Sequence, residues 1–237
     1  MKTLNIISSP RNISTALMYS FAHRTDTEVV DEPFYAVYFI KTGIVHPGRE
    51  EVLKEQPHNE EDVLKDLFGV HNKPVFFIKN MAHHLEVLES FPFEHCENIF
   101  LIRNPKQIIA SYAQVIDLPV MRDIGIEYQY NLFERLKALG QNPLVLDSGL
   151  LLENPEAVLT NLCHNLKIPF ERSMLTWAAG PKPYDGVWAP YWYANVHKST
   201  GFEKQPTSER PLPEHLTTLY LEAKKYYEKL LPFALRP

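Results

Sequence analysis

The alternation of short apolar runs with longer amphipathic segments is the feature of this sequence that most restricts its fold. The apolar runs have the length of strands, and several are apolar at every position, as expected when both faces of a strand are covered. Strand and helix patterns that alternate predict an α/β fold with a parallel sheet between two layers of helices. The predicted strands are residues 4–8, 28–30, 74–78, 98–102 and 143–146, and the predicted helices are 14–24, 60–68, 84–91, 105–115, 125–139, 154–166 and 214–231.

Residues 177–213 interrupt this alternation with proline, glycine and aromatic residues. A long irregular segment in a compact domain is usually a lid or a binding loop, or else it is disordered. The aromatic residues argue against disorder. With 237 residues and 45% hydrophobic composition, we expect one domain over residues 1–237 that includes this aromatic-rich segment.

Charge and cysteine content exclude several classes of protein. A net charge of −5 provides no cationic field for nucleic acid or an anionic membrane. We see no apolar stretch of membrane-spanning length and no secretory signal. Cys96 and Cys163 lack metal-ligand spacing and suit a reducing compartment. We therefore expect a cytoplasmic protein without a metal site, and the sequence does not indicate its oligomeric state.

The loop after the first predicted strand, SPRNIST at residues 9–15, combines a basic side chain with hydroxyl groups. Ligands of open α/β sheets collect beyond the carboxyl ends of strands, and a helix that begins there offers unpaired N–H groups and a positive dipole end. Arg11 adds charged donors, Ser14 and Thr15 add hydroxyls, and Asn12 or Ser14 can cap the helix. The loop predicts a phosphate or sulfate site, and the alternative is a capped helix start with a solvent-facing arginine.

A second arginine follows the fourth predicted strand, in the stretch NIFLIRNPKQIIASY at residues 98–112. Arg103 stands at the carboxyl end of the strand, and the helix opened by Pro105 carries Ser111. Because parallel strands end at the same edge of a sheet, Arg103 and Arg11 should lie close together. Two converging cations predict a doubly anionic ligand.

Together these stretches resemble the sulfotransferases that use 3'-phosphoadenosine 5'-phosphosulfate (PAPS). In that family a (K/R)-S-G-(S/T)-T loop grips the 5'-phosphosulfate, and an R-(N/D)-P-x-x-x-x-x-S unit holds the 3'-phosphate. The resemblance implies a P-loop NTPase-like sulfotransferase fold, PAPS as donor, 3',5'-ADP as product and a small-molecule acceptor with a hydroxyl or an amine. The residues that it assigns to PAPS are Arg11, Asn12, Ile13, Ser14, Thr15, Arg103 and Ser111.

Two later stretches extend the resemblance over most of the chain. LVLDSGLLLENPEAVLTNLCHNLKIPF looks like a late strand and helix of the family. WAPYWYANVHKSTGF is similar to the C-terminal loop of a bacterial sulfotransferase-like subgroup, in which a basic Ser/Thr-Gly stretch folds over the cofactor. This similarity assigns Lys198, Ser199 and Thr200 to PAPS, with a flexible surface loop as the alternative.

The first motif departs from the family at three positions. Arg11 replaces the lysine of many cytosolic members, which keeps the charge but not the ability to donate a proton. Asn12 replaces serine, and Ile13 stands where the family usually has glycine, which predicts a less close approach of the backbone to the ligand. Because of these departures, the alternative interpretation is a protein of the same fold that binds the nucleotide but does not catalyse transfer. An ATP-dependent kinase is a further alternative, opposed by the absence of a GxxxxGK[ST] loop and of an aspartate placed to hold a metal.

The resemblance gives Arg11 the role of stabilising charge on the leaving phosphate, and the acceptor needs a base. Glu32 follows the second predicted strand, with Asp31 as a weaker rival, and His83 and His84 follow the third. Adjacent helical residues point in different directions, so at most one of the two histidines is expected to face the cleft.

Lys79 and the aromatic residues of the irregular segment each have two interpretations. Lys79 can contact the sulfuryl oxygens or only solvent. The aromatic rings can line the acceptor pocket, since they supply apolar area with polar tips, or they can pin the segment to the core. These rings belong to Trp188, Tyr191, Trp192 and Tyr193.

Overall fold

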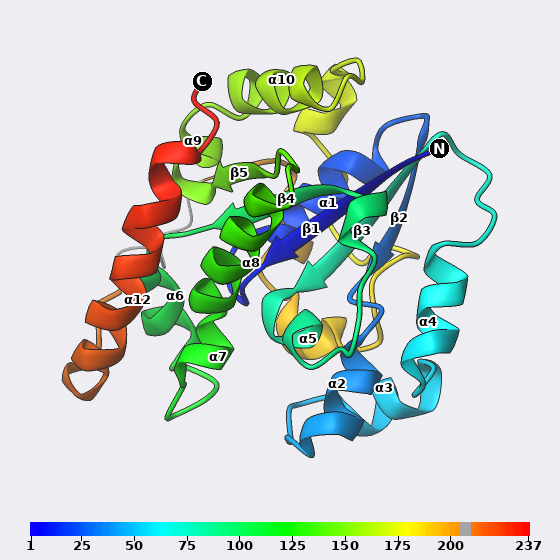
Figure 1. The fold of residues 1–237 in the computed structure, drawn as a ribbon. Coiled ribbons are helices and arrows are strands. Elements are labelled where there is room, and N and C mark those ends of the chain that lie inside the picture. Colours follow the sequence, from blue (N-terminus) through cyan, green and yellow to red (C-terminus); the bar gives the residue numbers. More distant parts are fainter. Residues whose placement is uncertain (204–209) are drawn as a thin grey trace.

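A parallel five-stranded sheet forms the centre of the molecule in the computed structural model, which describes residues 1–203 and 210–237 (Figure 1). The strand order is β2-β3-β1-β4-β5. Each predicted strand is present, with boundaries that differ by a few residues, so the α/β fold with a parallel sheet is confirmed. The strands are β1 (Lys2–Ser8), β2 (Thr27–Asp31), β3 (Val75–Met81), β4 (Glu97–Ile102) and β5 (Leu144–Asp147).

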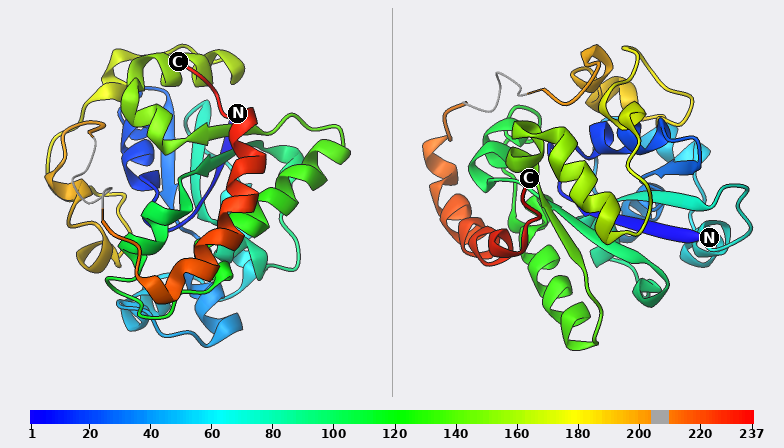
Figure 2. Two further views of the ribbon diagram at one scale, coloured as in Figure 1. Left: turned by 90° about the vertical axis from the view of Figure 1, so that its left-hand side faces the viewer. Right: turned by 90° about the horizontal axis from the view of Figure 1, so that it is seen from above.

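Helices cover both faces of the sheet, because successive side chains of each strand point to opposite faces. Leu4 and Ile6 of β1 belong to one core with the buried sides of α1 (Ser14–Ala22) and α10 (Pro155–Asn165). Ile7 belongs to the other core, with α8 (Ile126–Ala138) and α12 (Thr217–Leu230). Figures 1 and 2 show these two layers on either side of the strands.

The remaining helices show where the sequence patterns were misleading. The helix predicted at residues 84–91 is instead α5 (Ala82–Glu86), so that boundary prediction is wrong. α2 was not predicted because residues 35–39 are all buried and show no amphipathic period. No helix within residues 1–203 and 210–237 has the length and apolarity needed to cross a membrane. The other helices are α2 (Tyr35–Thr42), α3 (Arg49–Glu55), α4 (Glu60–Leu67), α6 (Pro105–Tyr112), α7 (Met121–Ile124) and α9 (Ser148–Glu153).

The aromatic-rich segment packs on the rest of the molecule through a third apolar cluster. It contains two short helical turns, α11 (Ala189–Trp192) and η3 (Val196–Lys198), and an antiparallel bridge joins Thr176 to Gly201. Trp188 and Tyr193 are buried against α2 and α3. Part of the predicted irregular segment, residues 204–209, lies outside the described residues.

Candidate active site

The loop between β1 and α1 leaves the start of the helix open to a cavity. Arg11 and Ile13 have left-handed backbone angles, with φ of 59° and 53°. Ile13 is the N-cap of α1 and gives no side-chain hydrogen bond to it, while Asn12 Nδ2 donates inward to the Leu101 carbonyl at 2.5 Å. The expected cap by Asn12 or Ser14 is therefore wrong. No side chain of the described residues caps the first turn of α1, which borders the cavity and suits an anion.

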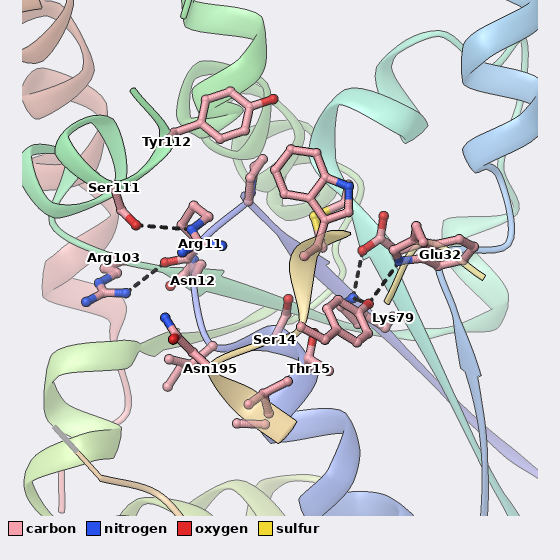
Figure 3. A pocket seen from close by; sticks show the side chains of 18 of the residues that line it. Arg11, Asn12, Ser14, Thr15, Glu32, Lys79, Arg103, Ser111, Tyr112 and Asn195 are labelled. Carbon is pink, nitrogen blue, oxygen red and sulfur yellow. Dashed lines mark hydrogen bonds and ion pairs between the residues drawn. The ribbon is translucent and has the colours of Figure 1, made fainter. Parts of the chain in front are cut away.

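Arg11 and Arg103 meet at the carboxyl ends of β1 and β4 (Figure 3). The Arg103 Nη1 group donates to the Arg11 carbonyl at 2.7 Å, and its Nε donates to Gln107 Oε1 at 2.9 Å. Arg11 Nε donates to Ser111 Oγ at 3.0 Å. Within the part of the chain that the structure describes, the hydrogen-bond partners of both guanidinium groups are neutral, so neither group is paired directly with a carboxylate.

Burial and the closeness of other cations lower the pKa values of both arginines. Burial lowers the pKa of Arg11, and nearby Arg210 lowers it further. Burial also lowers the pKa of Arg103, with an additional contribution from Arg11 that nearby Asp147 opposes. An anion would relieve this repulsion. Arg210 was missed at the sequence level, because it follows no strand and belongs to neither of the two arginine motifs.

The predicted C-terminal residues differ in their relation to the cavity. Ser199 borders the cavity and is held in place by Trp177, whose Nε1 donates to Ser199 Oγ at 3.1 Å. Lys198 and Thr200 are exposed and do not line the cavity. Since only the middle residue is tied inward, its two neighbours face away from the site.

A second group of charges lies on the other side of the cavity, around Lys79 at the end of β3 (Figure 3). Lys79 is completely buried, and its Nζ lies 2.7 Å from both Asp31 Oδ1 and Glu32 Oε1 and 2.6 Å from the Tyr193 hydroxyl. That hydroxyl donates to Asp31 Oδ2 at 2.6 Å and accepts from Trp188 Nε1 at 3.1 Å. Lys79 is therefore not a solvent contact, and this Lys79 cluster fixes the aromatic-rich segment to the sheet.

Protonation within the Lys79 cluster follows from burial and pairing. Burial opposes the charge of Lys79, but Asp31 and Glu32 reverse this effect and raise its pKa. Burial raises the pKa of Glu32, and Lys79 opposes the increase. Glu32 also has a left-handed backbone, with φ of 41°, and its N–H donates to the Lys79 carbonyl at 2.8 Å. A strained backbone thus holds a carboxylate at the cavity wall.

Both predicted histidines border the cavity, which corrects the expectation that at most one would do so. Their rings lie 4.4 Å apart and nearly perpendicular, because α5 begins at the cavity wall and its first side chains diverge around the helix end. Burial lowers the pKa of His83 to about 3 and that of His84 well below 6.5, so both imidazoles are neutral at pH 7. Neither nitrogen of His84 has a hydrogen-bond partner within the described residues, and its Nδ1 lies 3.9 Å from Glu32 Oε2.

Aromatic rings complete the wall beside these histidines. They follow one another in ring contacts from Tyr112 to Trp192, His46, Tyr35 and Trp188, with centroid separations of 5.3 to 6.3 Å. The Tyr35 hydroxyl lies 3.0 Å from His46 Nδ1, and burial lowers the pKa of His46 to about 4. Tyr35, His46 and Tyr112 were missed at the sequence level, although Tyr35 and Tyr112 closely follow Glu32 and Ser111.

Tyr191 lies apart from the other aromatic residues of its segment. It is 48% exposed and does not line the cavity, and its hydroxyl donates to Glu51 Oε1 at 2.7 Å. The interpretation of Tyr191 as a pocket residue is therefore wrong, whereas Trp188, Trp192 and Tyr193 line the cavity. No group of His, Cys, Asp and Glu side chains within residues 1–203 and 210–237 is arranged to hold a metal ion.

Comparison with known proteins identifies the family to which this arrangement belongs. The profile of the sulfotransferase domain matches residues 1–231. The chain belongs to the sulfotransferase domain family. This sulfotransferase domain is 43% identical over 208 residues to branched-chain-amino-acid aminotransferase-like protein 1 of Arabidopsis thaliana, and 39% identical over 215 residues to the like-named protein 2. These matches cover 87% and 90% of the chain, which spans 37% and 38% of the two plant proteins.

Solved structures with the same fold come from other sulfotransferases. The sulfotransferase domain of the Synechococcus PCC 7002 olefin synthase superposes with a TM-score of 0.60 at 17% identity, over 96% of this chain and 94% of that one. The sulfotransferase from Alicyclobacillus acidocaldarius gives a TM-score of 0.53 at 14% identity, over 100% and 97%. These likenesses confirm the sulfotransferase fold predicted from the two arginine motifs.

Proposed function

We propose that this sulfotransferase domain transfers a sulfuryl group from PAPS to a hydroxyl or an amine of a small molecule. The convergence of Arg11 and Arg103 beside the open start of α1 is the observation that carries the proposal. PAPS supplies a sulfuryl group whose S–O bond to the 5'-phosphate breaks as a new bond forms between sulfur and the acceptor, the electron pair staying on the phosphate oxygen.

The residues at this end of the cavity fit a doubly phosphorylated nucleotide. Partly buried guanidinium groups with neutral hydrogen-bond partners favour an anionic ligand, and an arginine fork matches phosphate oxygens. Arg11, with the first turn of α1, would hold the 5' group and stabilise charge on the leaving oxygen. Arg103 and Ser111 would hold the 3'-phosphate. Ile13 has the left-handed backbone that glycine adopts at low cost, so the substitution keeps the loop conformation despite its side chain.

We assign the role of base to Glu32 rather than to either histidine. Its Oε1 is fixed by Lys79 at 2.7 Å, and burial raises its pKa, which makes the carboxylate a stronger proton acceptor. His83 and His84 are held neutral but are weak bases, since their pKa values are strongly lowered. In this assignment, His84 uses its unpartnered nitrogens to orient the acceptor hydroxyl.

Two measurements test the proposal. Calorimetric titration should show that 3',5'-ADP binds more tightly than ATP, and the opposite order would overturn the assignment to PAPS. Radiolabelled PAPS with a panel of hydroxylated and amino acceptors should then yield labelled product. Binding of 3',5'-ADP without turnover of any acceptor would support a nucleotide-binding protein in place of an enzyme.

A further inference from the structure

The aromatic wall of the cavity, which the donor nucleotide would not fill, has an electrostatic character of its own. Glu32, Lys79 and a series of aromatic and imidazole rings border this end, whereas Arg11 and Arg103 border the other. Figure 3 shows the two sets of charges on opposite sides of Ser14 and Thr15. The acceptor therefore enters surroundings that differ in sign from those of the nucleotide.

The Lys79 cluster has one more carboxylate than cation. Lys79 is shared between Asp31 and Glu32, and the second oxygen of Asp31 is satisfied by the Tyr193 hydroxyl and the Gly186 N–H. With Glu32 ionised, the cluster carries a net negative charge at the cavity wall. In a site of low dielectric such a charge favours a cation and repels an anion.

The neighbouring titratable groups do not cancel this charge. His46, His83 and His84 are neutral, because burial lowers the pKa of each. Arg122 of α7 is paired with Glu86 at 3.0 Å. Asp123 adds negative field, since it contributes to raising the pKa of Tyr112 and Tyr38.

The rings beside Glu32 supply a second feature that favours cations. The Tyr35 ring is covered by stacked Phe39 and His84, at centroid distances of 4.4 and 4.6 Å, so it supports the wall, whereas the half-buried ring of Trp192 borders the cavity. Trp192 contacts Tyr112 at 6.3 Å with the ring planes inclined by only 22°. The faces of tyrosine and tryptophan rings attract quaternary ammonium groups, most strongly where water is excluded.

From the charge of the Lys79 cluster and the rings beside it, we propose that the acceptor is a small amino alcohol whose ammonium group is held by the aromatic wall. This inference rests on the proposed function and narrows its acceptor class. Transfer forms a bond between the acceptor oxygen and sulfur, breaks the S–O bond to the 5'-phosphate, and moves the hydroxyl proton to Glu32. The product is a zwitterion with a sulfate ester at one end and an ammonium group at the other.

Choline and its uncharged isostere 3,3-dimethylbutan-1-ol test this assignment, because they differ in charge at nearly constant shape. Each would be titrated calorimetrically into the full chain saturated with 3',5'-ADP, where no sulfuryl group is present and binding is measured without turnover. We expect choline to bind at least about tenfold more tightly than the isostere. A contact of the ammonium group with one ring face and with the carboxylate would give a difference of this size. Equal affinities, tighter binding of the isostere, or no choline binding would overturn the proposal.

Two variants separate charge from shape. Glu32→Gln should weaken the binding of choline about tenfold and change the affinity for the isostere by less than about twofold, because the amide keeps the shape of the carboxylate and loses its charge. Trp192→Leu should weaken the binding of choline severalfold, because it removes the half-buried indole ring that would contact the ammonium group. Unchanged choline affinity in both variants would exclude the aromatic wall as the cation site. The titration with 3',5'-ADP beforehand tests the proposed function by itself, and if it fails, the choline comparison is made in the nucleotide-free chain.

Discussion

The two ends of the cavity both contain partly or fully buried cations, but only at one end are these cations hydrogen bonded to carboxylates. Arg11 and Arg103 are hydrogen bonded to neutral groups, whereas Lys79 is held between two carboxylates and a tyrosine hydroxyl. A buried cation with neutral partners is prepared for an anionic ligand, while a cation that is fully paired holds the protein together. Burial alone therefore does not distinguish a ligand-binding cation from a structural one, but the partners do.

Removal of the Lys79 charge is the strongest test of this contrast. Lys79→Met should lower the free energy of unfolding at pH 7.5 by about 3–5 kcal/mol, because Asp31 and Glu32 would remain buried without their cation. Urea unfolding measures the loss. Arg122→Met is the control, since its exposed pair with Glu86 should contribute at most about 1 kcal/mol. A loss below 1 kcal/mol for Lys79→Met would mean that the cluster does not stabilise the fold.

Arg103→Ala tests the opposite end by ligand binding. This substitution should weaken the binding of 3',5'-ADP about 100-fold, which corresponds to about 2.7 kcal/mol. The affinity for 5'-AMP should fall less than about threefold, because only 3',5'-ADP has a 3'-phosphate. Gln107→Ala is the matched control, since it removes the Nε partner and keeps the guanidinium. Equal losses for both nucleotides would show that Arg103 acts through the shape of the Arg11 loop instead.

Acid should affect the aromatic end through its neutral histidines. The folded-state pKa of His83 is about 3, below its ordinary value of 6.5, so the unfolded chain takes up a proton that the folded chain excludes. The free energy of unfolding is therefore unaffected by His83 well above pH 6.5 and decreases as the pH falls below 6.5. Between pH 7.5 and 5.5 this decrease is about 1.4 kcal/mol. His83→Asn should reduce the loss of unfolding free energy over this interval by that amount. An unchanged pH dependence would place a charged or exposed imidazole at this position.

The smallest expected effect is at Ile13 and concerns the backbone of the loop between β1 and α1. Because φ of Ile13 is 53°, Ile13→Gly should be more stable than Ile13→Ala by about 1 kcal/mol, as the glycine releases the left-handed strain. Ala16→Gly, within α1, should have the ordinary opposite sign, with a loss of about 1 kcal/mol. Thermal unfolding measures all three variants, and an Ile13→Ala protein at least as stable as Ile13→Gly would argue against strain in the loop.

The sequence predicted the end of the cavity with the two arginines better than the aromatic end, and the reason is physical. Arg11, Arg103 and Ser111 each follow a strand at a fixed spacing, so a local pattern was sufficient to place them together. The sheet and its helices were predictable for the same reason, since strand and helix periodicities are local.

The aromatic end of the cavity is assembled from segments that are distant in the chain. Tyr35, His46 and Trp192 come together only through the packing of α2, a loop and α11, and no spacing records this. The role of Lys79 also depended on Tyr193, which lies 114 positions away. The helix α2 was missed because its first five residues, 35–39, are all buried and show no polar face that would reveal a helical period.

The hydrogen bond from the Arg103 side chain to the Arg11 carbonyl joins the carboxyl ends of β4 and β1. Ser8 of β1 and Leu101 of β4 are paired in register, and the two arginines follow within three residues of that pair. The distance between the two backbone segments that carry the arginines is therefore set by the sheet. In the proposed function, a bisphosphate whose phosphates are spaced differently should bind more weakly even though its charge is the same.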